Sequence, residues 1–329
     1  MKFLKVFLIT LLVILVGFSV FIYKGELPKE EVDAKYTGPT SQFFTMDNGA
    51  RVHFRDEGNQ SGPVIVLVHG SNASLHTWEP WVKEFSDGYR IVSMDLPAHG
   101  LTGGVPDADY TSQAQLNTVS AVASHLGLES FVLGGNSMGG GVTWRYTLKH
   151  PEQVSAMLLI DASGPPQWWQ ERQAELDGEE RAAPLAFQLL QKPWFRLIAK
   201  RIDPYYLTEQ GVRSAYNNSP VVDQALIDRY YELSLRQGTR DATLSRFSQR
   251  PNTDVEYDLS KLTQPTLVMW GKEDSLIPAS MADKFAEVLP NTTVVVYDDV
   301  GHIPMEEIPE RSAKDVLEFL RGLETTTGE

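Results

Sequence analysis

Apolar and polar positions along this chain follow two periods, one typical of strands and one typical of helices. The predicted strands are 41–46, 50–56, 64–68, 90–95, 130–135, 154–161, 265–270 and 293–297. The predicted helices are 74–85, 112–126, 138–150, 279–288 and 308–323. The first two strands form a hairpin, and the later ones alternate with the helices. This alternation predicts a mostly parallel sheet with helices on both faces.

The alternation stops between about residues 165 and 257. This stretch has helical spacing, many aromatic side chains and no convincing strand, and strands resume soon after it. It therefore reads as an insertion within one domain that covers residues 41–329, rather than as a second domain. The preceding segment, residues 25–40, is mostly polar and charged and is expected to be a linker.

Residues 6–23 form an uncharged stretch between Lys5 and Lys24. As a helix it would span about 27 Å, close to the hydrocarbon thickness of a bilayer. We expect residues 1–24 to be a single-pass membrane anchor, with the catalytic domain outside the cytoplasm. The alternative is a signal peptide that is cleaved before secretion, but no small-x-small cleavage site follows. The lysines on the two sides balance, so they do not decide the orientation.

Composition narrows the possible functions. The chain has 329 residues, with 29 Lys and Arg against 43 Asp and Glu, and a formal net charge of −14. Nucleic-acid binding needs a basic surface that displaces counterions, so this balance argues against it. The chain has no cysteine, which excludes disulfides, a thiol nucleophile and thiolate metal sites.

The segment Gly135-Asn136-Ser137-Met138-Gly139 joins a predicted strand to a predicted helix. A sharp turn there would hold the serine in a strained conformation with its hydroxyl exposed. The residues two before and two after must then be small, and both are glycine. The first amides of the helix, beginning with that of Met138, would point at the negative charge that develops on the substrate oxygen during the reaction. A phosphate-binding turn is the alternative, but no G-x-G-x-x-G or P-loop signature accompanies it.

An acid and a histidine follow the serine in the order of a catalytic triad. Asp274 follows the strand at 265–270, and His302 follows the last strand. The carboxyl ends of parallel strands meet at one crevice, so Ser137, Asp274 and His302 can converge there. Asp161, which also ends a strand, is the alternative acid.

The strand at 64–68 ends in His69-Gly70-Ser71-Asn72. A loop at this place usually supplies the second oxyanion amide, which we assign to Ser71, with Asn72 as the alternative. His69 is expected to fix the loop rather than to act as a base. The other histidines show no metal-ligand spacing, so no metal site is expected.

Together these motifs resemble those of the α/β-hydrolase superfamily, over roughly residues 41–329. The matching pieces are His69-Gly70, Asp95-x-Pro97-x-His99-Gly100, Gly135 to Gly140, Gly271-x-x-Asp274 and Gly301-His302-x-Pro304. The anchor and the elbow resemble those of membrane-anchored lipases and esterases, including cold-active bacterial lipases and monoacylglycerol-lipase-like enzymes. The resemblance implies an α/β-hydrolase fold with a mostly parallel eight-stranded sheet, a helical cap over the serine and no cofactor.

The resemblance implies a serine hydrolase that cleaves carboxylic esters, monoacylglycerols among them, through an acyl-enzyme. Ser137 would be the nucleophile, His302 the base and Asp274 the residue that orients it, with Ser71 and Met138 supplying the oxyanion amides. The substrate would be a small ester or a lipid, and the bilayer a partner through residues 6–23. The oligomeric state stays open.

Three other functions remain as alternatives. Hydrolases that cleave carbon–carbon bonds of ring-fission products share the elbow, but usually carry a glycine-rich oxyanion loop and a Trp after the histidine. Here Asn72 and Ala73 follow Ser71, and Ile303 follows His302. A cofactor-free perhydrolase and a non-catalytic binding protein on a hydrolase scaffold are the other two.

Four aromatic side chains of the cap are candidates for an acyl-binding pocket: Trp168, Trp169, Trp194 and Phe195. An equally good interpretation is that these residues pack the helical insertion onto the sheet.

Overall fold

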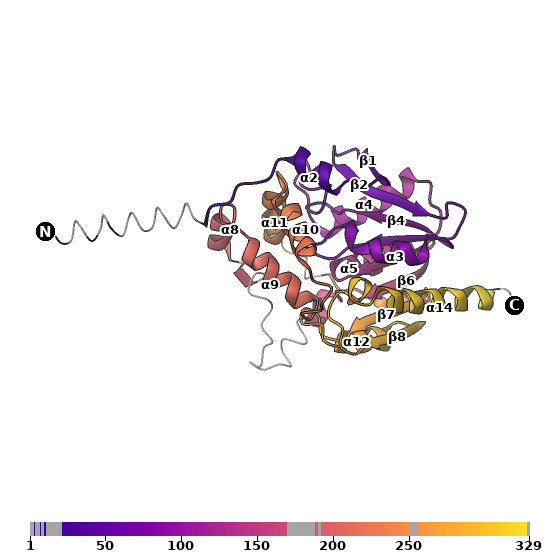
Figure 1. Ribbon diagram of the computed structural model, residues 1–329. Coiled ribbons are helices and arrows are strands. Elements are labelled where there is room, and N and C mark those ends of the chain that lie inside the picture. The colour runs from indigo at the N-terminus through magenta and orange to yellow at the C-terminus, as the bar shows by residue number, and fades with distance from the viewer. Residues whose placement is uncertain are drawn as a thin grey trace.

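The chain folds around one central sheet (Figure 1). The computed structural model describes residues 22–169, 188–189, 192–249 and 255–327, together with Phe3, Phe7 and Thr10. The sheet has eight strands in the order β1-β2-β4-β3-β5-β6-β7-β8. Strand β2 runs antiparallel to both of its neighbours, and the pairs from β4 to β8 are parallel. The predicted mostly parallel sheet is confirmed.

Each predicted strand is present, with ends that differ by no more than two residues. The strands are β1 Ser41–Thr45, β2 Arg51–Gly58, β3 Val64–Val68, β4 Arg90–Met94, β5 Phe131–Asn136, β6 Val154–Ile160, β7 Thr266–Gly271 and β8 Thr292–Tyr297. β3 lies inside the sheet and is buried along almost its whole length. Its unbroken run of Val, Ile and Leu is what burial on both faces requires.

The five helices predicted outside the insertion are present, together with a short helix at residues 304–307 that was not predicted. They are α3 Glu79–Phe85, α4 Ser112–His125, α5 Met138–Lys149, α12 Ser280–Val288, α13 Pro304–Glu307 and α14 Pro309–Thr327. The predicted helix at 74–85 is divided, because a 3₁₀ turn at Leu75–Trp78 precedes α3.

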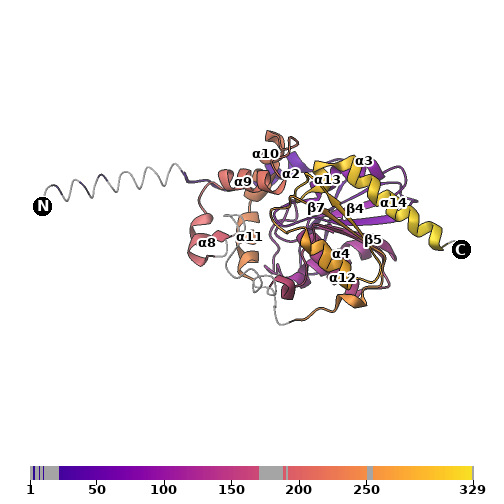
Figure 2. The ribbon, with the colours of Figure 1, turned by 90° about the horizontal axis from the view of Figure 1, so that it is seen from below.

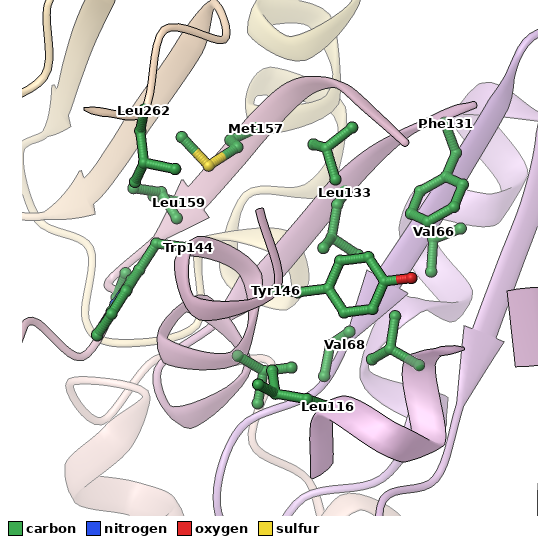
Figure 3. Close-up of a cluster of buried hydrophobic side chains, with 14 of the residues drawn as sticks. Val66, Val68, Leu116, Phe131, Leu133, Trp144, Tyr146, Met157, Leu159 and Leu262 are labelled. Atoms are coloured by element: carbon green, nitrogen blue, oxygen red, sulfur yellow. The ribbon is translucent and has the colours of Figure 1, made fainter. Parts of the chain in front are cut away.

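Two hydrophobic layers hold these helices on the sheet. Helices α4, α5 and α12 cover one face, and α3 and α14 cover the other. Figure 3 shows the first layer, where Trp144 and Tyr146 of α5 pack beside Leu133 of β5 and Leu159 of β6. This packing fixes α5, and therefore its first residue, against the end of β5.

The insertion between β6 and β7 is helical, as predicted. Its helices are α8 Pro193–Ala199, α9 Tyr205–Ala215, α10 Gln224–Leu235 and α11 Thr239–Ser248, and its described part contains no strand of the sheet. Figures 1 and 2 show these four helices gathered at one end of the molecule, with the C-terminal end of α14 at the opposite end. We call residues 165–257 the cap.

The segment expected to be a linker is structured. Residues 25–40 contain helix α2, Lys29–Tyr36, whose Val32 is 2% exposed. Asp33 of this helix accepts from Arg236 of the cap, with 2.6 Å between Oδ1 and Nε. The polar composition that indicated a linker instead supplies ion pairs to the cap.

The predicted anchor at 6–23 lies outside the described residues, apart from Phe7, Thr10, Ile22 and Tyr23. Within the part of the chain that the structure describes, no helix has the length and apolar character needed to cross a bilayer.

Candidate active site

Ser137 stands at the turn between β5 and α5. Its backbone angles are φ 55° and ψ −117°, a conformation that is rare and strained for a residue with a side chain. A Cβ on Gly135 would lie 2.3 Å from the carbonyl carbon of Gly139, and a Cβ on Gly139 would lie 2.0 Å from the carbonyl oxygen of Val68. Only glycine fits at either position, so the turn has the strained geometry that the motif predicts.

His302 and Asp274 meet at the carboxyl ends of β7 and β8. The distance from Nδ1 of His302 to Oδ2 of Asp274 is 2.6 Å, and both residues are buried. Oδ1 of Asp274 accepts from the amides of Leu276 and Ile277 at 2.7 and 3.0 Å. The carboxylate is thereby fixed, and it holds the imidazole with Nδ1 as donor and Nε2 as acceptor.

Asp161, the alternative acid, lies beside this pair without bonding to the histidine. Its Oδ1 accepts from the amide of Gly271 at 2.9 Å. Burial, and then the charge of Asp274, raise the pKa of Asp161 well above its usual range. Burial therefore favours the protonated form of Asp161, and Asp274 is the acid that the structure pairs with His302.

Asp161, Asp274 and His302 also form a cluster, with one ligand atom of each within 4.8 Å of the others. Among the described residues, no other group of acids and histidines is close enough to share a metal ion. A protonated carboxyl and a histidine already bonded to a carboxylate are poor ligands. The cluster is better explained as an acid–histidine pair beside a buried carboxyl whose pKa is raised.

The loop that carries His302 is held from three sides. Asn136, directly before the serine, donates from Nδ2 to the carbonyl of His302 at 3.0 Å. The amide of His302 donates to the carbonyl of Ala215 in the cap at 2.7 Å. The carboxylate of Glu307 accepts from the amides on both sides of the histidine, those of Gly301 and Ile303. Sequence reasoning missed these supports, although Asn136 was visible in the motif.

The predicted oxyanion residues follow the serine in sequence or share its cavity. Met138 is the first residue of α5, so its amide has no acceptor inside the helix. Ser71 follows β3 and lines the same cavity as Ser137 and His302. His69 donates from Nδ1 to the carbonyl of Gly70 at 2.7 Å and accepts at Nε2 from an amide of the next strand's loop at 3.1 Å. With both nitrogens occupied, His69 fixes the loop, as predicted.

Arg246 of α11 reaches this loop from the cap, and sequence reasoning missed it. Its Nη2 donates to Oγ of Ser71 at 2.8 Å and to Oδ1 of Asn72 at 3.2 Å, and its Nη1 lies 3.7 Å from Sδ of Met138. No acidic side chain of the described residues pairs with it. Burial lowers the pKa of Arg246 to about 10, so the group is charged at pH 7. In the sequence it looked like an ordinary polar helix position.

Ser137 and His302 open onto a cavity of about 250 Å³ between the sheet and the cap. Its lining is mostly aliphatic and aromatic, and the cap supplies most of it. The lining residues from the cap include Phe195, Ala199, Ile202, Leu207, Val212, Leu233, Arg240 and Leu244.

Of the four aromatic residues proposed for this pocket, only Phe195 lines it. Trp168 packs against Phe285 in the core, with ring centroids 4.9 Å apart. Trp169 packs against the same core, and Trp194 is 57% exposed on the outer side of α8. Hydrophobic character alone does not say which side of a helix faces the cavity.

Comparison with known proteins agrees with this fold. The family described as alpha/beta hydrolase fold matches residues 63–309. Lipase 1 of Psychrobacter immobilis is 25% identical over 85% of this chain and 84% of the lipase. A 2-hydroxy-6-oxononadienedioate/2-hydroxy-6-oxononatrienedioate hydrolase of Burkholderia vietnamiensis is 26% identical over 82% of this chain and 91% of the relative.

Among solved structures, a bacterial membrane phospholipase A superposes with a TM-score of 0.68 and 22% identity. The match covers 98% of this chain and 99% of the other. At this identity the likeness shows the fold alone. Because the family match extends over most of the chain, this protein belongs to the alpha/beta hydrolase fold family and is a hydrolase.

Proposed function

We propose that this protein hydrolyses carboxylic esters with an apolar acyl chain, through an acyl-enzyme on Ser137. The observation that carries this proposal is the strained serine elbow and the His302–Asp274 pair opening onto one largely apolar cavity. An activated serine with a positioned base fits acyl transfer, and an aliphatic cavity fits an acyl chain.

The reaction would proceed in two halves. Nε2 of His302 takes the proton of Ser137 as Oγ bonds to the ester carbonyl carbon, and the oxyanion receives the amides of Met138 and Ser71. The carbon–oxygen bond then breaks, and the protonated His302 returns the proton to the leaving alcohol. Water, deprotonated by the same imidazole, then bonds to the acyl carbon. The bond from this carbon to Oγ breaks, His302 returns the proton to Ser137, and the acid is released. Asp274 holds the imidazole throughout.

One observation favours a second candidate, the hydrolysis of carbon–carbon bonds in a carboxylated substrate. Arg240 lines the cavity, and its Nη1 donates to the carbonyls of Lys24 and Lys200, both at 2.9 Å. Its Nη2 is buried, with no hydrogen-bond partner among the described residues. This N–H is free to donate to a substrate carboxylate. We rank this candidate second because the remaining lining is mostly apolar.

Fluorophosphonate labelling and a substrate panel test both candidates. We expect the probe to label wild-type protein and not Ser137→Ala, with Ser275→Ala as a control that keeps the label. Arg240→Met should retain the hydrolysis of p-nitrophenyl octanoate if the substrate is an ester with an apolar chain. If wild type cleaves a dicarboxylic ring-fission analogue but no ester, and Arg240→Met abolishes that cleavage, the second candidate replaces the first.

We also propose that residues 6–23 tether the protein to a bilayer, on the strength of their length and lack of charge. A tethered chain stays with the membrane fraction after carbonate extraction. Release into the supernatant at full length would count against the tether.

A further inference from the structure

Helix α8 has two different apolar faces. Phe195 and Ala199 point to the cavity that contains Ser137. Trp194, Leu197 and Ile198 lie on the outside, and their exposed fractions are 57%, 74% and 47%. Three large apolar side chains exposed within seven residues are unusual for a surface that only water covers.

The charge of the segment that contains α8 is opposite in sign to that of the whole chain. Residues 192–202 contain Lys192, Arg196, Lys200 and Arg201 and no acid, while the whole chain carries −14. Lys200 forms a surface ion pair with Asp241 at 2.9 Å. A short helix with Trp, Leu and Ile outside and basic residues at both ends is typical of segments that lie in the headgroup region of anionic lipid.

The end of the proposed tether lies against the turn that directly follows this helix. The amide of Lys24 donates to the carbonyl of Arg201 at 2.9 Å, and the amide of Asp203 donates to the carbonyl of Ile22 at 2.7 Å. The two views agree, because α8 and the start of the described N-terminal segment lie at the same end of the molecule (Figures 1 and 2). A bilayer that holds residues 6–23 would therefore begin within a few residues of the C-terminal end of α8.

We infer that α8 is a membrane-contact helix, which lies in the headgroup region of an anionic bilayer and separates lipid from the catalytic cavity. Trp194, Leu197 and Ile198 enter the boundary of the acyl chains, and the basic residues contact lipid phosphates. One helix thickness then separates a lipid acyl chain from Phe195 in the cavity. The substrate class that follows is a bilayer lipid ester, and this part rests on the proposed ester hydrolysis.

The test uses the full-length chain reconstituted in vesicles of equal parts phosphatidylcholine and phosphatidylglycerol. Phosphatidylcholine brominated on the acyl chains quenches tryptophans that reach the boundary. We expect wild-type fluorescence to be quenched more than that of Trp194→Phe, and the difference to shrink in vesicles of phosphatidylcholine alone. Equal quenching of the two proteins would overturn the inference.

The second measurement uses the double variant Leu197→Glu/Ile198→Glu. Its hydrolysis of a long-chain monoacylglycerol in the vesicles should fall about tenfold or more, the order expected when a Leu-sized side chain can no longer be buried. Hydrolysis of soluble p-nitrophenyl butyrate should not change, which also shows that the variant folds. Val296→Glu on β8, where Val296 is 42% exposed, is the matched control and should behave as wild type.

The outcomes separate this inference from the proposed function. If wild type cleaves no ester but Trp194 is quenched, the membrane contact stands and the ester function fails. If the esters are cleaved and the double variant equals wild type on vesicles, the membrane contact fails alone. The inference is also wrong if Trp194 is not quenched and the detergent-solubilised double variant has a lower particle mass than wild type. That result would mean that α8 binds a second copy of the chain.

Discussion

A carboxylate oxygen of Asp161 lies within 4.8 Å of one of Asp274, at the adjacent ends of β6 and β7. Only Asp274 bonds to His302, while Asp161 is buried with its pKa raised well above the usual range by burial and by the charge of its neighbour. Two buried carboxyls at this separation do not both ionise readily. The division of roles between them leads to the first two predictions.

Asp161→Asn should leave catalysis almost unchanged, because a neutral amide replaces a carboxyl of the same shape whose protonated form burial favours. Asn also tolerates the left-handed backbone of this position, where φ is 43°. The raised pKa means that the folded state of wild type binds a proton that the unfolded state releases. Wild-type stability therefore falls as pH rises above about 4, the ordinary pKa of an aspartate, and Asn removes this loss.

Urea unfolding of wild type and Asp161→Asn between pH 4 and pH 8 measures this difference. The free energy of unfolding of the variant should gain on that of wild type as the pH increases. A constant gap across the range would mean that Asp161 is ionised in the folded protein.

Asp274→Asn should lower kcat for ester hydrolysis by about 10⁴-fold, the size seen when a triad acid no longer fixes the histidine tautomer. The steady-state rate on p-nitrophenyl esters measures it, and Asp161→Asn is the matched control. Similar losses in both variants would contradict the assignment of Asp274 as the partner of the histidine.

Arg246→Met should lower kcat by about 10- to 100-fold with a smaller effect on KM. The variant loses a charged hydrogen bond that positions Ser71 beside the oxyanion site, and such bonds are worth about 1.5–3 kcal/mol. Arg246→Lys keeps the charge but cannot bond to Ser71 and Asn72 with one rigid fork. Its kcat should therefore lie between those of wild type and Arg246→Met. Arg213→Met removes an arginine of the cap that pairs with Glu209 near the surface, and should match wild type. Unchanged kcat in Arg246→Met would remove Arg246 from the site.

Gly139→Ala should lower the free energy of unfolding by about 3 kcal/mol or more and abolish activity, because its Cβ would lie 2.0 Å from a strand carbonyl. Gly322→Ala in α14 is the control, because nothing lies within 4 Å of the added Cβ. It should raise stability by about 0.5–1 kcal/mol, as expected for alanine in a helix. Thermal unfolding and ester turnover measure both, and an active Gly139→Ala would show that the elbow is looser than the structure indicates.

Asp33→Ala should destabilise the cap by about 3 kcal/mol, because it leaves the buried guanidinium of Arg236 without its carboxylate. Limited proteolysis of residues 192–249 and urea unfolding report the loss. Glu209→Ala breaks the more exposed pair with Arg213 and should cost less than about 0.5 kcal/mol. Equal effects would show that α2 does not hold the cap.

The sequence alone determined those features of this protein that depend on residues close together in the chain. The run Val64–Val68 coincides with β3, and the turn chemistry around Ser137 predicted the elbow, because both depend on neighbouring residues. The order of Ser137, Asp274 and His302 predicted which loops carry the site, because parallel strands bring their carboxyl ends together. The segment 25–40 shows the limit of such reasoning, because its charges pair with cap residues far away in the sequence.

Only the tertiary structure decided the rest. Asp161 and Asp274 both follow strands. Only the folded arrangement pairs Asp274 with His302 and buries Asp161 beside it with a raised pKa. Arg246 reaches Ser71 across 175 positions of sequence, which no local pattern encodes. The two sides of α8 differ for the same reason, because Phe195 faces the cavity and Trp194 faces outward only once the cap is folded.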